Sequence, residues 1–230
     1  MAQAPVDRRR LRGDESRRAV LTHAVDTATV DGLDGLTIGR LADASGHSKS
    51  GIATLFGSKE QLQLAVIAAA RDVFVDSVVA PARERTPRGL ERVCALLSDW
   101  LAYSRDRVFR GGCFFAATSV EFDAKPGPIR DAIVAASSEW EDYLARSIEH
   151  AMAAGELPLL DDARQLTFET VSFLEAANTR SLLHASAEPY RRAEVALRTR
   201  LIALGGDPAL VASIGATAGT GTGASVTASA

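Results

Sequence analysis

The chain has 230 residues, of which 47% are apolar, and its formal net charge is −3 at pH 7. This length allows one large domain or two small ones, and the small net charge excludes a general electrostatic attraction to nucleic acid. No apolar run approaches the roughly 20 residues that a membrane helix needs, and the Arg-rich start has no apolar stretch typical of a secretory signal. We therefore expect a cytoplasmic protein.

Positive charge is concentrated at the start of the chain. Residues 1–18 hold six arginines against three acidic residues, and Arg8, Arg9 and Arg10 are adjacent to one another. We predict a disordered basic arm over residues 1–14. Such an arm is equally consistent with a local anionic partner and with simple solvation.

The first helices are predicted from apolar spacing and from residues that begin and end helices. A helix from about residue 15 to residue 30 has apolar side chains at helical spacing, and Gly32 ends it. Thr37 is a favourable N-cap for a second helix, which ends near Ser45 and Gly46.

Two further helices are predicted directly afterwards. Ser48 caps a very short third helix, and Gly57 ends it. Ser58 then begins a fourth helix, with Gln61 three residues later, as in a capping box.

The rest of the chain also reads as helices. Pro87 is expected to open one in its first turn, and Pro128 opens a long one. Two more are predicted over residues 161–184 and 188–204. Residues 206–230 are rich in Ala, Gly, Thr and Ser and are predicted to be a disordered tail. Because no stretch alternates with period two, the predicted fold class is all-α.

The second and third helices, joined by residues 45–47, fit a helix-turn-helix. The third helix has apolar residues Ile52, Leu55 and Phe56 that can pack on the first two helices, whereas its start is polar. A polar helix start with free backbone N–H groups is typical of a surface that faces DNA phosphates and base edges. The alternative is that Ser48 and Ser50 only cap the helix and that Lys49 is solvated.

The same stretch resembles the DNA-binding signature of TetR-type (tetracycline-repressor-like) regulators. The resemblance covers residues 16–62, and the matching residues are Leu36, Thr37, Ile38, Leu41, Ala42, Ala44, Gly46, Ser48, Lys49, Phe56, Ser58, Lys59, Glu60 and Leu62. A weaker resemblance to the C-terminal region of one subgroup of that family covers residues 111–115, 121–123 and 126–128.

The resemblance implies an all-α bacterial regulator that lies on the nucleoid when it is bound to DNA. It would be a repressor that binds a palindromic operator as a homodimer and is released by a small-molecule effector. A DNA-binding domain with a helix-turn-helix would occupy residues 15–60, and a larger helical dimerisation and ligand-binding domain residues 61–205.

The family's contact residues can be carried over by position. The resemblance implies phosphate contacts at Thr37, Ser48, Lys49 and Lys59, and groove contacts at Ser50, Gly51, Thr54 and, at the edge, His47. Because Gly51 has no side chain, Ser50 and Thr54 are the better candidates for sequence specificity. The arm with Arg8, Arg9 and Arg10 can add contacts to the minor groove or to the phosphate backbone.

The chain departs from the family pattern within the helix-turn-helix. Members usually carry an aromatic residue where Ala53 stands, and often a polar group where Leu55 stands. We expect these departures to affect DNA contacts more than the fold. They keep open the hypothesis of a protein-interaction adaptor that has lost DNA binding.

The last two helices carry apolar stripes suited to an interface. We predict that the dimer interface includes Leu166, Phe173, Leu174, Ala177, Leu197 and Leu201, with two helices from each chain forming a four-helix bundle. The alternative is that both stripes belong to the core of a single chain.

Aromatic residues gather in the middle of the C-terminal part. We predict that an apolar effector pocket is lined by Trp100, Tyr103, Phe114, Phe115, Phe122, Trp140 and Phe168. Arg180 or His184 could orient an acidic ligand there. The alternative is that these aromatic side chains are ordinary core residues.

A small all-α enzyme is a further hypothesis, and the residues argue against it. The four histidines are not in a metal-binding spacing, no glycine-rich phosphate loop is evident, and no serine lies in a nucleophile elbow. Cys94 and Cys113 fit neither a zinc site nor a disulfide framework, and we interpret them as small buried apolar residues rather than redox groups. We expect no catalytic residues, no metal and no cofactor.

Overall fold

The structure, a computed structural model, describes the backbone of residues 8–215 and the side chains of residues 13–215. Within this part of the chain every regular element is a helix, so the predicted all-α fold class is confirmed. The elements are α1 (Arg8–Asp31), α2 (Ile38–Ser45), α3 (Lys49–Phe56), α4 (Lys59–Phe74), the π-helical segment η1 (Val75–Val79), α5 (Ala80–Arg85), α6 (Leu90–Arg105), α7 (Phe114–Phe122), α8 (Pro128–Ala153), α9 (Ala163–Leu183), α10 (Glu188–Ala203) and α11 (Pro208–Val211).

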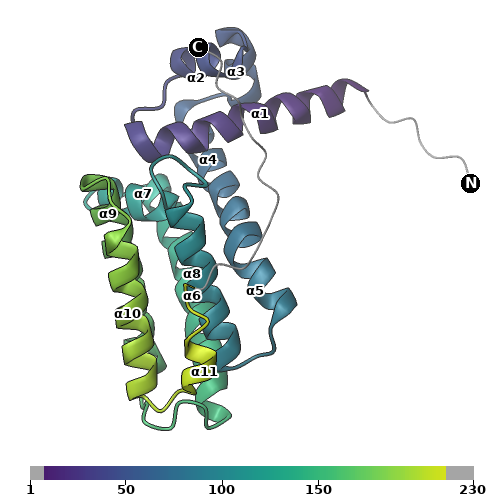
Figure 1. Ribbon diagram of the computed structural model, residues 1–230. Helices are drawn as coiled ribbons and strands as arrows, with labels where there is room; N and C mark the ends of the chain where they lie inside the picture. Colours follow the sequence, from purple (N-terminus) through teal and green to yellow (C-terminus); the bar gives the residue numbers. More distant parts are fainter. Residues whose placement is uncertain (1–7, 216–230) are drawn as a thin grey trace, which may run out of the picture.

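Helices α1, α2 and α3 form a small unit at one end of the molecule, where α1 lies across α4 and α7 (Figure 1). The predicted caps form: Thr37 Oγ1 accepts the Arg40 N–H at 3.2 Å, and Ser48 Oγ accepts the Gly51 N–H at 3.0 Å. Gly46 turns the chain between α2 and α3 with φ of 69°, a conformation that favours glycine.

Helix α4 continues through η1 and α5, and it carries the chain from the N-terminal unit into the body (Figure 1). Ser58 Oγ accepts the Gln61 N–H at 3.1 Å, as predicted for the start of α4. The π-helical segment has a local cause. Pro81 lacks an N–H and therefore cannot continue the usual hydrogen-bond ladder, and the Ala80 N–H bonds to Val75 O, five residues back.

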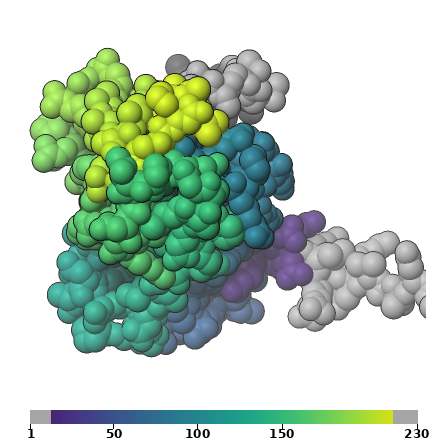
Figure 2. All heavy atoms as spheres, turned by 90° about the horizontal axis from the view of Figure 1, so that it is seen from below, coloured from purple at the N-terminus to yellow at the C-terminus, as the bar shows by residue number. Residues whose placement is uncertain are grey.

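The body is built from α6, α8, α9 and α10, with α7 packed beneath α1 (Figure 1). Its centre is formed by almost fully buried leucines, among them Leu97, Leu101, Leu144 and Leu197. Seen from the opposite end, the later helices of the body lie in front, and the part of α1 that is drawn in purple projects to one side (Figure 2).

The predictions of disorder at the two ends of the chain were partly wrong. Helix α1 begins at Arg8 rather than near residue 15, because the arginines and Leu11 are good helix formers that extend the apolar part of the helix. At the other end, Asp207 caps α11, and Val211 and Ile214 are buried against the body. Of the predicted arm and tail, residues 1–7 and 216–230 lie outside the described residues.

The start of α6 also differs from the prediction. Pro87 precedes the helix, which begins at Leu90 after Gly89. The Leu90 N–H donates to Glu156 Oε2 at 2.7 Å, so a carboxylate from the loop after α8 satisfies the first turn. This cap depends on a contact between distant parts of the chain, which local sequence does not show.

Candidate nucleic-acid interface and ligand cavity

The start of α3 presents small polar groups and backbone donors to solvent. Ser48 Oγ holds the Gly51 N–H and lies 3.2 Å from Ser50 Oγ. The first backbone bond of the helix runs from Ile52 N to Ser48 O at 3.1 Å. The N–H groups of Lys49 and Ser50 therefore precede the hydrogen-bonded ladder and can bind an anion outside the helix.

A shallow hollow of about 430 Å³ lies where α3 meets α1. Its lining residues are Gly13, Ser16, His47, Ser48, Ser50, Gly51, Thr54 and Leu55. Five of the predicted DNA-contacting residues therefore share one surface, together with two small residues of α1. Small side chains keep this surface open enough for another backbone to approach closely.

Thr37 and Lys49 both lie close to Gly39 in the first turn of α2. A Cβ atom at Gly39 would stand 3.6 Å from Lys49 Cε and 4.0 Å from Thr37 Oγ1. Lys49 is exposed and forms no ion pair within residues 13–215. The structure thus brings together the capped start of α2, a free ammonium group and the capped start of α3.

Lys59, predicted to contact phosphate, is held by the turn between α1 and α2. Its Nζ donates to Asp34 O at 2.7 Å and lies 3.6 Å from Asp34 Oδ1. His47 Nδ1 bonds to Ser45 O at 2.8 Å, so that nitrogen must carry the proton. Only Nε2 of His47 remains for an outside partner.

Two arginines that the sequence reasoning did not select also shape this unit. Arg17 Nη1 donates to Leu55 O at 2.9 Å, and its guanidinium lies 4.6 Å from the centre of the Phe56 ring, so it fastens α3 to α1. Arg40 is exposed in the first turn of α2 and pairs with Asp31 at 3.2 Å. The sequence could have indicated Arg40 as a candidate, because it lies three residues after the Thr37 cap, in the first turn of the helix. Arg8, Arg9 and Arg10 lie in the first turn of α1, and their side chains lie outside the described ones.

Most of the predicted dimer residues are buried within the single chain. Five of them, which are Leu166, Leu174, Ala177, Leu197 and Leu201, are at most 2% exposed. The assignment of Leu166, Leu174, Leu197 and Leu201 to an interface was wrong, because an apolar stripe on a helix does not show which neighbour covers it. Ala177, although only 2% exposed, lines a groove on the outer side of α9 and α10. Only Phe173, at 36% exposure, remains accessible.

The outer face of α9 and α10 instead carries other exposed apolar side chains, which are Phe168, Leu182, Leu183, Val195 and Ile202. Next to them, a groove of about 500 Å³ between the two helices is lined by Phe173, Ala176, Arg180, His184 and Ala196, among others. Arg200 Nε on α10 pairs with Glu169 Oε2 on α9 at 2.6 Å and holds the two helices together. Arg180 and His184 therefore belong to this outer face and not to an aromatic pocket.

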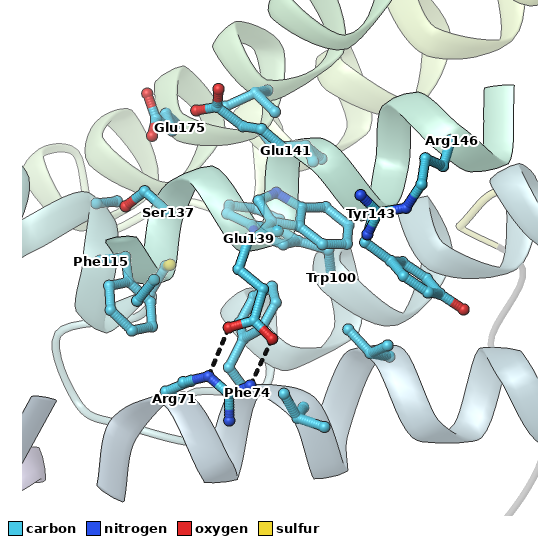
Figure 3. Close-up of a pocket in the computed structure, with 18 of the residues that line it drawn as sticks. Arg71, Phe74, Trp100, Phe115, Ser137, Glu139, Glu141, Tyr143, Arg146 and Glu175 are labelled. Carbon is cyan, nitrogen blue, oxygen red and sulfur yellow. Dashed lines mark hydrogen bonds and ion pairs between the residues drawn. The ribbon is translucent and has the colours of Figure 1, made fainter. Parts of the chain in front are cut away.

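A cavity of about 280 Å³ lies inside the body, between α4–α5, α6, α7, α8 and α9. Aromatic rings form its walls: Phe74, Trp100, Phe115 and Trp140 (Figure 3). Phe74 stacks edge-on against Trp140, with ring centres 5.2 Å apart, and against Phe115 at 6.3 Å. Three of the seven predicted pocket residues, Trp100, Phe115 and Trp140, therefore line a cavity.

The other four predicted pocket residues do not line it. Tyr103 and Phe114 are core side chains, and Phe122 contacts a separate shallow groove between α7 and α8. Phe168 is 70% exposed on the outer face of α9. The sequence indicated the right part of the chain for a cavity, but it does not show which face of each helix lies toward the cavity and which lies toward the core or solvent.

Charged groups surround the cavity, as Figure 3 shows. Arg71 Nε and Nη2 donate to the two carboxylate oxygens of Glu139 at 2.6 and 2.5 Å, and this pair lowers the pKa of Glu139. On the α8–α9 side, loss of solvation raises the pKa of Glu141 and of the partly exposed Glu175. Arg146, which is also on α8, lies beside Tyr143 in Figure 3.

Both cysteines are buried thiols, as predicted. Burial raises the pKa of Cys94 to about 12 and that of Cys113, which touches the cavity, to about 11. Among residues 8–215 no group of histidine, cysteine and carboxylate side chains could hold a metal ion. In the same part of the chain, no helix has the length and apolar character to span a bilayer.

Comparison with known proteins gives a consistent picture. A family model described as "Tetracyclin repressor-like, C-terminal domain" matches residues 89–197. A search of curated proteins found no match.

Several solved structures share the fold. A TetR transcriptional regulator from Chloroflexus aurantiacus is 27% identical, with a TM-score of 0.72 over 79% of this chain and 91% of that one. A TetR-family regulator from Agrobacterium tumefaciens is 18% identical, with a TM-score of 0.73 over 83% of this chain and 98% of that one. AibR, solved in complex with isovaleryl coenzyme A and operator DNA, is 20% identical, with a TM-score of 0.60 over 71% and 86% of the two chains.

Proposed function

We propose that this chain, a TetR-family transcriptional regulator by its similarity to that family, is a repressor that binds a palindromic operator as a homodimer. Residues 15–60 contact the DNA, residues 61–205 form the dimer and hold a small-molecule effector, and the protein is not an enzyme. The observation that carries the proposal is the hollow at the start of α3, where five of the predicted DNA-contacting residues share one surface.

Groups around the hollow match the parts of a DNA groove. The free N–H groups of α3 and the ammonium of Lys49 suit phosphate oxygens. Thr54 is exposed and its Oγ1 donates to Ser50 O at 2.8 Å, so its hydroxyl hydrogen is occupied and its methyl group suits apolar contact with a thymine methyl. Ser50 keeps a hydroxyl for polar contact with a base edge.

A palindromic site requires two copies of this surface, about 34 Å apart for successive major grooves. The exposed apolar side chains of α9 and α10, and the groove that contains Phe173, are the face that supports a two-fold contact. Phe173→Glu is expected to give monomers in sedimentation velocity experiments. Val120→Glu is the matched control, because Val120 is 75% exposed on α7, away from this face. Equal dimer content in both variants would place the interface elsewhere.

The aromatic cavity supports the effector part of the proposal. Its volume and aromatic walls suit a small molecule with an apolar body, and its charged edges can orient polar groups of that molecule. The bound isovaleryl coenzyme A of the similar AibR structure shows that this fold admits a small ligand in that protein. An effector would act by favouring a conformation in which the two α3 helices no longer match the grooves.

Selection of bound duplexes from a random pool tests this function. We expect enrichment of an inverted repeat, and we expect Ser50→Ala or Thr54→Ala to change the preferred bases. Failure to enrich any sequence at low ionic strength would contradict the proposal and favour the adaptor hypothesis.

A further inference from the structure

Helix α7 and the two glycines before it connect the cavity with the N-terminal unit. Cys113, Phe115 and Ala116 form one wall of the cavity, and Phe115 lies at its side in Figure 3. The same short helix packs beneath α1 (Figure 1). The Gly-Gly-Cys-Phe-Phe motif at residues 111–115 therefore lies between the cavity and the N-terminal unit.

At its C-terminal end, α7 holds the turn between α1 and α2. Glu121 Oε2 accepts the Leu33 N–H at 2.7 Å, and Oε1 accepts the Asp34 N–H at 2.8 Å. Gly32 has φ of 82°, and a Cβ atom there would stand 3.1 Å from Glu121 Oε1. The carboxylate thus occupies the turn that leads directly into α2 and α3.

The same turn is held a second time by a basic residue. Lys125 Nζ, just beyond α7, pairs with Asp34 Oδ2 at 3.0 Å. From the other side, Lys59 and Gln63 of α4 donate to Asp34 O and Leu33 O. The turn therefore connects α7 with α4.

At its N-terminal end, α7 is fastened to α1. The Gly111 N–H donates to Thr29 Oγ1 at 3.0 Å, and a Cβ atom at Gly111 would lie 2.1 Å from Thr29 O. The preceding Arg110 binds Asp26 through its N–H at 2.8 Å and its Nε at 2.6 Å. Only glycine allows the loop to approach α1 this closely.

The same loop is anchored to α9 in the body. Asn178 Oδ1 accepts the Cys113 N–H at 3.0 Å and the Ser104 hydroxyl at 2.8 Å, and all three groups are buried. A Cβ atom at Gly112, which has φ of 75°, would stand 2.0 Å from Asn178 Oδ1. The loop that forms part of the cavity wall is therefore bonded to both α9 and α1.

We infer that α7 transmits occupancy of the cavity to the DNA-binding unit, with Glu121 as the positioning residue that sets the turn before α2 and α3. This inference rests on the proposed function and adds a connection besides the continuous α4. An occupant that pushes against Phe115 or Ala116 shifts α7, and Glu121 carries the shift to Leu33 and Asp34.

A double-mutant cycle on duplex binding tests the inference. Ala116→Phe fills the cavity from α7, and Ala136→Leu fills it from α8. Glu121→Gln preserves the size of the side chain but removes its charge and one acceptor oxygen. The matched control is Asp123→Asn, because the exposed Asp123 carboxylate forms no side-chain hydrogen bond or ion pair within residues 13–215. Affinity is measured for the duplex recovered from the random pool.

We expect each filling substitution to weaken duplex binding on the order of tenfold in the parent protein, within the usual range of coupling between sites. In the Glu121→Gln background the same substitutions should cost less than about threefold, whereas the Asp123→Asn background should leave the tenfold loss intact. Effects that simply multiply would overturn the inference and leave the proposed function standing. A parent protein that binds no duplex would instead overturn the proposed function.

Amide hydrogen exchange gives a readout that needs no DNA. Filling the cavity should speed exchange at Leu33 and Asp34, whose N–H groups Glu121 holds, while circular dichroism shows unchanged helix content. A folded Ala116→Phe or Ala136→Leu protein in which these two amides exchange at the parent rate would contradict the inference.

Discussion

Replacing Lys49 with alanine tests whether the start of α3 faces DNA phosphates. Lys49 is exposed, lies beside the Thr37 cap across Gly39, and makes no ion pair within residues 13–215. Its ammonium is therefore available to displace a counterion from DNA. A lysine that already pairs with a group of the protein would contribute less to the salt dependence of DNA binding.

The magnitude follows from counterion release. Each phosphate neutralised on duplex DNA contributes about 0.9 to the slope of log affinity against log salt concentration. A homodimer presents two copies of Lys49, so Lys49→Ala should reduce the slope by about 1.8. Between about 50 and 200 mM salt, this difference means that the variant loses about tenfold less affinity than the parent protein.

Fluorescence anisotropy titrations at four or more salt concentrations measure both slopes. Lys59→Ala is the matched comparison, because Lys59 Nζ already bonds to Asp34 O at 2.7 Å and its release to DNA would break that contact. We expect a smaller change of slope for Lys59→Ala. An unchanged slope for Lys49→Ala, or a larger change for Lys59→Ala, would refute this reading of the interface.

Three other predictions concern the body. Asn178→Ala leaves the buried Cys113 N–H and Ser104 hydroxyl without their acceptor, and should lower the free energy of unfolding by roughly 2–4 kcal/mol, measured by urea denaturation. A decrease of less than about 1 kcal/mol would contradict the role of Asn178 as acceptor. Cys94 and Cys113, with raised pKa values of about 12 and about 11, should react with a thiol reagent at pH 8 at least about 100-fold more slowly than in urea, and comparable rates would contradict their burial. Arg71 lowers the pKa of Glu139 in the folded state, so the pair stabilises the protein above the unfolded pKa and this contribution is lost as pH falls through the lower folded value. Glu139→Gln should therefore flatten the loss of stability between about pH 5 and pH 3, by at most about 1 kcal/mol because both side chains are at least 40% exposed, and an unchanged profile would count against the pair.

Local signals in the sequence predicted the helix-turn-helix well. The caps at Thr37, Ser48 and Ser58, and the turn at Gly46, depend on hydrogen bonds within a few residues, so the sequence contains the whole interaction. The long-range contacts of the same unit were not predictable in this way. Nothing near Lys59 in the sequence indicates that Asp34 holds it.

Predictions about faces of helices were less successful for the same reason. The stripe through Leu166, Leu174 and Leu197 was recognised as apolar. Apolar side chains are buried both in the core of one chain and in an interface between two chains, so the pattern alone does not distinguish the two. The helical tail at residues 208–211 was missed because its stability comes from Val211 and Ile214 docking on the body rather than from its own composition.

In the proposed complex, two copies of the start of α3 lie in successive major grooves of one duplex. To test this arrangement, Ser50 is replaced with cysteine, an iron chelate that cleaves DNA is attached there, and the cuts are mapped on the recovered operator. The raised pKa values of the buried Cys94 and Cys113 direct the chelate to position 50. The account predicts two symmetric clusters of cuts about one helical turn, or roughly 34 Å, apart. A single cluster, or bound protein that leaves the operator uncut, would contradict it.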